Sequence, residues 1–242
     1  MRALLVTTLL FAAGVARADE TDPEAAAVVD RAVAASGGAE KLAALKAGVW
    51  KTSGTFRGQQ SRAEFSGELP DKFRIDSTRV VDGKTVQHAR IINGERGWVV
   101  TDGRVTPMTE DELKGVRASY YHKRLATTLL PLKDKECLLS FEGVRALEGK
   151  PVAVVKAVRK GYPDVTLFFD KESGLLAKSE SVQRSGSGSD VHVELFFNQF
   201  RDFDGIKIAT RTKALHDGKP FLETEITEFK QVKSLPPETF QP

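Results

Sequence analysis

The chain of 242 residues has 36 Lys and Arg against 33 Asp and Glu, and 40% of its residues are hydrophobic. This near balance of charge, without a run of five or six like charges, excludes the electrostatic pattern typical of nucleic-acid-binding proteins. The single cysteine, Cys137, excludes an intrachain disulfide and a cysteine-rich metal site.

The N-terminal segment has the layout of a secretory signal peptide. A short positive start precedes a mostly apolar run over residues 3–15, and small residues stand at Ala16 and Ala18. The apolar run is shorter than the roughly 20 residues that cross a bilayer. We therefore expect cleavage after Ala18 and release into a bacterial periplasm. The first mature residue would be Asp19 and not the cysteine of a lipoprotein, so no lipid anchor is expected.

Two short helices are predicted at the start of the mature chain. Asp22 and Pro23 suit the N-cap and the first helical position, and apolar residues follow at helical spacing over 25–35. The sequence Ser36-Gly37-Gly38 ends this helix. A second, brief helix is expected over 39–46.

From Val49 onward the hydrophobic period changes to two, which predicts strands with one buried face. We expect a single domain over 19–242, built on a meander of about ten antiparallel strands that must curl or close. The Ser- and Gly-rich stretch 185–189 predicts a mobile hairpin loop. The other predicted turns are marked by the dipeptides Asp82-Gly83, Asn93-Gly94, Asp102-Gly103, Ser173-Gly174, Asp204-Gly205 and Asp217-Gly218.

One helix interrupts the strands, from Thr109 to about Leu130. Thr109 and Glu112 form a capping box, and Met108 and Leu113 occupy the positions of a hydrophobic staple. The residues that lie along one apolar stripe of this helix are Leu113, Val116, Tyr120, Leu125 and Leu129.

The titratable residues do not form a recognisable catalytic or metal-binding pattern. The four histidines are not spaced as metal ligands, and no Gly-x-Ser-x-Gly motif occurs. Glu64, Glu68 and Asp76 could form an acid pair, but they alternate with Phe65 and Phe73 and are therefore expected on a solvated face. We expect neither enzymatic activity nor a cofactor, and we expect exposed or partly paired imidazoles at His88, His122, His192 and His216.

Large apolar residues are concentrated on the first predicted strands, which allows two interpretations. They form an ordinary core between sheet and helix, or they line a cavity for a removable apolar ligand. The candidate cavity residues on the strands are Trp50, Phe56, Phe65, Phe73, Ile75, Trp98 and Val100. Those on and before the helix are Met108, Leu113, Val116, Tyr120, Leu125 and Leu129.

Several segments, taken in order, resemble one known family. They are residues 67–74 (GELPDKFR), 92–100 (INGERGWVV), 165–176 (VTLFFDKESGLL), 200–207 (FRDFDGIK) and the ending 235–240 (LPPETF). Together they are similar to the periplasmic lipoprotein carriers of the LolA family and their wider relatives, the outer-membrane lipoprotein-sorting proteins. The resemblance covers most of the chain from about Val49.

The resemblance implies an α+β fold: a curved, half-open antiparallel β-barrel with a helical lid over an apolar cavity. In the characterised carriers that cavity takes the acyl chains of lipoproteins, and envelope membrane proteins load and release the cargo. Those carriers have a basic residue before the proline that matches Pro70, whereas this chain has Leu69. Two functions remain open: a carrier or binder of lipid or lipidated protein, and an envelope sensor that binds a protein partner through the same half-barrel.

The processing site is directly testable. We expect the exported protein to begin at Asp19, because signal peptidase recognises small residues at the positions of Ala16 and Ala18. Intact-mass measurement of the exported protein checks this, and a mass that includes residues 1–18 would contradict both the cleavage and the compartment.

Overall fold

The structure, a computed structural model, describes residues 20–81, 83–184 and 188–242. The predicted signal peptide and residues 185–187 of the Ser- and Gly-rich loop lie outside the described residues. Within the described ranges no helix is long and apolar enough to cross a bilayer.

The described residues form three α-helices, two 3-10 helices and thirteen strands. The helices are α1 (Pro23–Ala35), α2 (Ala39–Ala44), α3 (Glu110–Thr128), η1 (Leu130–Lys133) and η2 (Pro237–Phe240). The first six strands are β1 (Ala47–Phe56), β2 (Gln59–Glu68), β3 (Lys72–Val81), β4 (Lys84–Asn93), β5 (Arg96–Thr101) and β6 (Arg104–Pro107). The others are β7 (Cys137–Leu147), β8 (Lys150–Arg159), β9 (Val165–Asp170), β10 (Leu176–Arg184), β11 (Asp190–Phe203), β12 (Ile206–His216) and β13 (Lys219–Val232).

All strands belong to one antiparallel sheet with the order β6-β5-β4-β3-β2-β1-β13-β12-β11-β10-β9-β8-β7. The prediction of about ten strands is too low. Two hairpins turn at Arg57-Gly58 and Glu148-Gly149, where both residues have positive φ but the first is neither Asn nor Asp, so the usual turn signal is missing. Pairing of β1 with β13 joins two meanders into one sheet.

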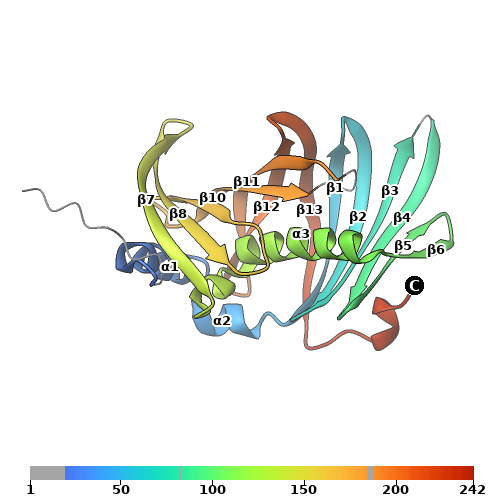
Figure 1. Ribbon diagram of the computed structural model, residues 1–242, viewed down its shortest axis with the longest axis horizontal. Helices are drawn as coiled ribbons and strands as arrows, with labels where there is room; N and C mark the ends of the chain where they lie inside the picture. The colour runs from blue at the N-terminus through green and yellow to red at the C-terminus, as the bar shows by residue number, and fades with distance from the viewer. Residues whose placement is uncertain (1–19, 82, 185–187) are drawn as a thin grey trace, which may run out of the picture.

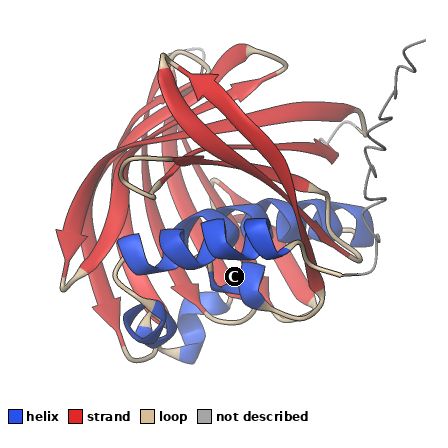
Figure 2. Cartoon of the chain, turned by 90° about the vertical axis from the view of Figure 1, so that its left-hand side faces the viewer, coloured by secondary structure: helices blue, strands red, loops and turns tan. Residues whose placement is uncertain are grey.

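Helix α3 lies in the connection between the two edge strands, β6 and β7, and its length fits a curved sheet better than a flat one. Thirteen flat strands at ~4.8 Å spacing would separate their edges by about 58 Å. The 19 residues of α3 span only about 28 Å. The sheet therefore curls, and α3 crosses its concave face (Figure 1). Figure 2 shows the strands arching over the helices. The sheet is not closed, because β6 and β7 remain its edges.

The main hydrophobic core fills one half of this arch. The inner faces of β7 to β9 pack against α1, η1 and the C-terminal half of α3. Leu125 of α3 has no exposed surface, and Leu167 and Phe169 of β9 are buried beside it in the same cluster. Asp22 caps α1 as predicted, since its side chain accepts hydrogen bonds from the backbone N–H groups of Glu24 and Phe141.

The N-terminal end of α3 lies directly on β5. The predicted capping box is present: the Thr109 hydroxyl accepts from the Glu112 N–H, and the Glu112 carboxylate accepts from the Thr109 N–H. Gly97 on β5 permits the close approach. A Cβ at Gly97 would lie 2.8 Å from the Met108 Sδ and 2.9 Å from a Leu113 methyl carbon.

The opposite end of α3 is held by a buried polar network. The imidazole of His122, 2% exposed, lies 2.8 Å from the Ser179 hydroxyl through Nε2 and 2.8 Å from the Gln183 Nε2 through Nδ1. A Gln183 N–H donor requires Nδ1 to accept, so the ring proton lies on Nε2 and faces Ser179. The expectation of an exposed or partly paired imidazole is thus met in the pairing of His122 but not in its exposure, since the ring is buried. Helix α3 therefore contacts β5 at its start and β10 through His122. These contacts hold the helix in place across the concave face.

The C-terminal segment covers part of the convex face. Phe240 of η2 is buried, and Arg74 of β3 donates hydrogen bonds to the carbonyls of Thr239 and Gln241. The tail thus packs over β3 and β4, near the β6 edge of the sheet.

Leu125→Ala should lower the free energy of unfolding by about 3 kcal/mol, because it leaves a cavity in the main core. Lys114→Ala, at an exposed position of the same helix, should change it by less than about 0.5 kcal/mol. Urea denaturation measures both. An unchanged unfolding midpoint for Leu125→Ala would contradict the placement of Leu125 in the core.

Acid should destabilise the fold through His122. Burial lowers the pKa of His122 from 6.5 to about 4. The unfolded chain therefore takes up this proton at a higher pH than the folded one, so stability is retained above pH 6.5 and lost as the pH falls toward 4. The loss from this group is on the order of 3 kcal/mol. Unfolding curves at several pH values should show a shallower pH dependence for His122→Asn, and equal slopes in the two proteins would refute the assignment.

Candidate functional site

An apolar cavity of about 220 Å³ opens between α3 and the concave face of the sheet. Its wall on β1 and β2 consists of Trp50 and Phe65, whose rings stack 5.0 Å apart at an angle of 4°. Phe73 of β3 lies 4.5 Å from the ring of Tyr120 on α3 and closes one end. Aromatic and aliphatic side chains of the last strands form the opposite wall: Leu195, Phe197, Ile208, Leu222, Ile226 and Phe229.

Glycine keeps the cavity open at its floor. A Cβ at Gly67 on β2 would lie 3.6 Å from the Trp50 ring and 3.8 Å from the Tyr120 hydroxyl, so any larger side chain there would extend into the space between them. Gly54 on β1 serves a different purpose: its φ is 158°, and a Cβ would lie 2.0 Å from the Glu223 carbonyl oxygen. The first glycine leaves room for a ligand, and the second lets β1 and β13 pair closely.

Positively charged side chains adjoin this aromatic wall. The Lys123 ammonium of α3 lines the cavity and lies 5.5 Å from the centre of the Phe65 ring. Cross-strand register places Arg90 on the same face as Phe65, in the row Trp50, Phe65, Ile75 and Arg90. Along β3, Arg79 follows on that face, four residues beyond Ile75, with its guanidinium 4.4 Å from the Phe56 ring.

These cations interact unfavourably with one another. Burial and the charge of Arg90 lower the pKa of Lys123 from 10.5 to about 8. Burial, followed by the charges of Arg90 and Arg57, lowers the pKa of Arg79. Burial and the same kind of repulsion, from Arg90 and Arg79, lower the pKa of His88 to about 4. The concave face is thus strongly positive beside its apolar cavity.

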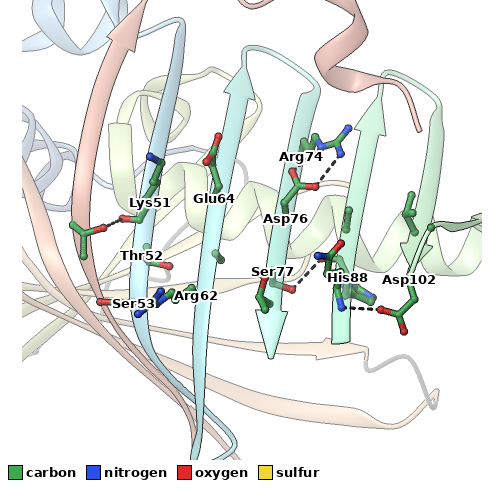
Figure 3. Close-up of a pocket in the computed structure, with 17 residues that line it drawn as sticks. Lys51, Thr52, Ser53, Arg62, Glu64, Arg74, Asp76, Ser77, His88 and Asp102 are labelled. Atoms are coloured by element: carbon green, nitrogen blue, oxygen red, sulfur yellow. Dashed lines mark hydrogen bonds and ion pairs between the residues drawn. The ribbon is translucent and has the colours of Figure 1, made fainter. Parts of the chain in front are cut away.

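A second, larger hollow of about 690 Å³ lies on the opposite, convex face (Figure 3). Three of its charged side chains are in ion pairs: Lys51, Arg74 and Asp76. The Arg74 guanidinium donates two hydrogen bonds to the Asp76 carboxylate, and the Lys51 ammonium lies 2.8 Å from the Glu228 carboxylate. We place the candidate site in the smaller hollow, because small-molecule sites are mostly apolar with a few polar groups.

The structure brings only some of the predicted cavity residues together. Those that line the inner cavity are Trp50, Phe65, Phe73, Tyr120 and Leu129. Register puts Ile75 and Phe56 on the same face, but away from this cavity. Met108 and Leu113 contact the Gly97 position on β5, and Val116 is half-buried and does not line the cavity.

Three predicted residues lie elsewhere for identifiable reasons. Register places Trp98 opposite Ile91 and Val100 opposite Ala89, which puts both on the convex face, and Val100 lines the larger hollow there. The alternation of β5 therefore has the opposite phase from the one assumed. Leu125 lies in the main core, with the buried residues of β7 to β9, and does not line the cavity.

The sequence analysis missed the wall formed by β11 to β13 and the cations. The alternating pattern of Val193, Leu195 and Phe197 indicates an inward face, but only the pairing of β1 with β13 brings that face to Trp50. Arg79 and Arg90 alternate in phase with Ile75 and Ile92, so the signal was present as charge at inward-facing strand positions.

No protein-family model and no curated protein matches the sequence. The fold is similar to that of several solved structures. A putative outer membrane lipoprotein-sorting protein domain of Vibrio parahaemolyticus has a TM-score of 0.56 at 11% identity, covering 90% of this chain and 96% of its own. A LolA superfamily protein of Nitrosomonas europaea has a TM-score of 0.56 at 10% identity, covering 90% and 97%. A DUF1329 family protein of Desulfovibrio piger has a TM-score of 0.52 at 15% identity, covering 91% and 98%. The resemblance of this chain to the LolA family is thus confirmed, at the level of the fold.

Proposed function

We propose that this protein is a periplasmic, non-enzymatic carrier or binder of lipid or lipidated protein, which holds an acyl chain between α3 and the concave face of the sheet. The observation that carries the proposal is the half-exposed aromatic wall of Trp50 and Phe65 at an open cavity. Aromatic side chains that a core would bury completely remain accessible there, which is typical of a ligand site.

The size of the cavity suits part of a single acyl chain. Its volume of about 220 Å³ exceeds the roughly 150 Å³ that admits a benzene molecule in an apolar protein cavity. Each methylene that leaves water contributes about 0.8 kcal/mol. Some fifteen methylenes along the cavity and the open face would contribute on the order of 12 kcal/mol before ordering costs.

The acidic side chains support a binder over a hydrolase. Glu64 and Asp76 are direct cross-strand neighbours, but they lie on the convex face, away from the aromatic cavity. Hydrogen bonds from Lys72 and from the Leu235 N–H lower the pKa of Glu68, whereas a general acid needs a raised pKa. The folds of the lipoprotein-sorting domain and the LolA superfamily protein are consistent with this function.

Filling the cavity should abolish ligand binding without unfolding the protein. Gly67→Leu places a side chain between Trp50 and Tyr120, whereas Glu64→Leu adds the same side chain to an exposed, convex-face position of the same strand. We expect Gly67→Leu to lower the affinity for a fluorescent fatty acid by at least about tenfold. Glu64→Leu should bind the fluorescent fatty acid as tightly as wild type does. Thermal melting followed by circular dichroism verifies that both variants fold.

Native mass spectrometry of the exported protein separates the remaining functions. Co-purified acyl lipid of unchanged mass supports a carrier. A ligand-free mass together with a specific protein partner would instead favour the sensor, and a cleaved lipid product would favour an enzyme.

A further inference from the structure

The cations of the concave face stand where the head group of a bound amphiphile would lie. The Lys123 ammonium is at the cavity wall, and Arg90 follows Phe65 and Ile75 along one cross-strand row. Between this row and Arg79 the inward positions of β2 and β3 are occupied by the small residues Ala63 and Ser77, and His88 lies opposite Ser77 on β4. The small side chains leave space on β2 and β3 between the aromatic wall and Arg79.

These cations have little compensating negative charge. Among the described residues, no carboxylate forms an ion pair with Arg79, Arg90 or Lys123. The Arg79 guanidinium donates a hydrogen bond to the Ser77 hydroxyl. Glu112 is the acid whose charge acts on Arg90, and its carboxylate already accepts hydrogen bonds from Thr109.

Such an arrangement is unfavourable in the free protein. Cations that crowd one another at a partly desolvated surface repel, and an anion placed among them removes that repulsion and adds favourable pairing. Arg90 is exposed and Arg79 and Lys123 are half-buried, so a ligand can reach all three. Lys123 on α3, and Arg90 and Arg79 on the concave face of the sheet, lie inside the arch, which fits a ligand that enters the cavity better than a flat membrane surface.

We propose that the cavity selects amphiphiles with a net negative head group, and that Lys123, Arg90 and Arg79 bind this group while the acyl chain lies against Trp50 and Phe65. This inference rests on the proposed function and specifies the chemical class of its ligand. Arginine presents a fork of donors to a carboxylate or a phosphate, so either head group satisfies the site.

Paired ligands that differ in charge test the proposal. Displacement of a fluorescent fatty acid is measured with oleate and with oleyl alcohol, which share the same chain. We expect oleate to bind at least about tenfold more tightly, with the preference falling as salt is raised, because salt screens accessible charges. Phosphatidylglycerol against phosphatidylcholine repeats the comparison for lipid head groups and separates a phosphate ligand from a free carboxylate.

A matched set of variants locates the effect. Arg79→Gln/Arg90→Gln/Lys123→Gln removes three charges from the concave face and should abolish the preference while binding of oleyl alcohol persists. Arg62→Gln/Lys213→Gln/Lys230→Gln removes three charges from exposed positions on the convex face and should preserve it. If the first variant melts well below wild type, the single change Arg90→Gln, at an exposed side chain, replaces it.

The outcomes distinguish this inference from the function on which it rests. Equal affinity of wild type for oleate and oleyl alcohol would overturn the charge selectivity and leave an apolar binder. Equal loss of preference in both triple variants would also overturn it, since the effect would then come from net charge. Failure of wild type to bind either ligand would refute the proposed function itself.

Discussion

The connection from β6 to β7 governs the architecture of this protein. These strands are the two edges of one wide sheet, and a helix much shorter than the width of the flat sheet joins them. The helix can contact β5 through Leu113 and β10 through His122 only if the sheet curls toward it, because these residues lie about 14 Å apart along α3 whereas β5 and β10 would lie about 38 Å apart in a flat sheet. Curvature, the position of α3 on the concave face and the space beneath it thus depend on the contacts of one helix with distant strands of the sheet.

The two halves of the arch solve the packing problem differently. Where β7 to β9 curve over α1, η1 and the end of α3, side chains such as Leu125 and Phe169 fill the interior completely. Among the described residues, no other helix fills the space between α3 and strands β1 and β2. The rings of Trp50 and Phe65 stack on each other there, beside an open cavity. One half therefore supplies the stability of the fold, and the other offers accessible apolar surface.

The two faces of the sheet differ in how their cations near the hollows are paired. On the convex face Arg74 and Lys51 each contact a carboxylate, Asp76 and Glu228 respectively. On the concave face Lys123 lines the cavity and Arg90 lies on the same face of the sheet, and neither has an ion-pair partner in the part of the chain that the structure describes. Burial and the charge of Arg90 lower the pKa of Lys123, so the positive charge on this face is held at a cost in free energy.

The buried network around His122 changes the role expected for α3. A lid that lifts would have to break the contacts of the imidazole with Ser179 and Gln183 and expose Leu125. Unpaired buried polar groups cost free energy, so these contacts hold the helix across the arch. Access to the cavity is then best explained by the open side of the half-barrel.

Local patterns in the sequence determined the elements and their ends. The Asp22 cap, the capping box of Thr109 and Glu112, and the period-two alternation predict the helices and a curled antiparallel sheet, because caps and alternation depend on neighbours within a few residues. Two hairpins turn at residues that include no Asn or Asp. The turn dipeptides therefore do not mark them, and the predicted number of strands is too low. The phase of β5, which turns Trp98 to the convex face, also could not be read from one short strand.

Only the tertiary structure decided the site. Trp50 meets Phe229 because the first and last strands pair across some 180 residues of chain. No local pattern encodes that partner choice, which depends on how the whole sheet closes on α3. The same holds for Lys123 and Arg90: each is an ordinary cation in its own segment, and they approach each other only because α3 crosses the face on which β4 directs Arg90.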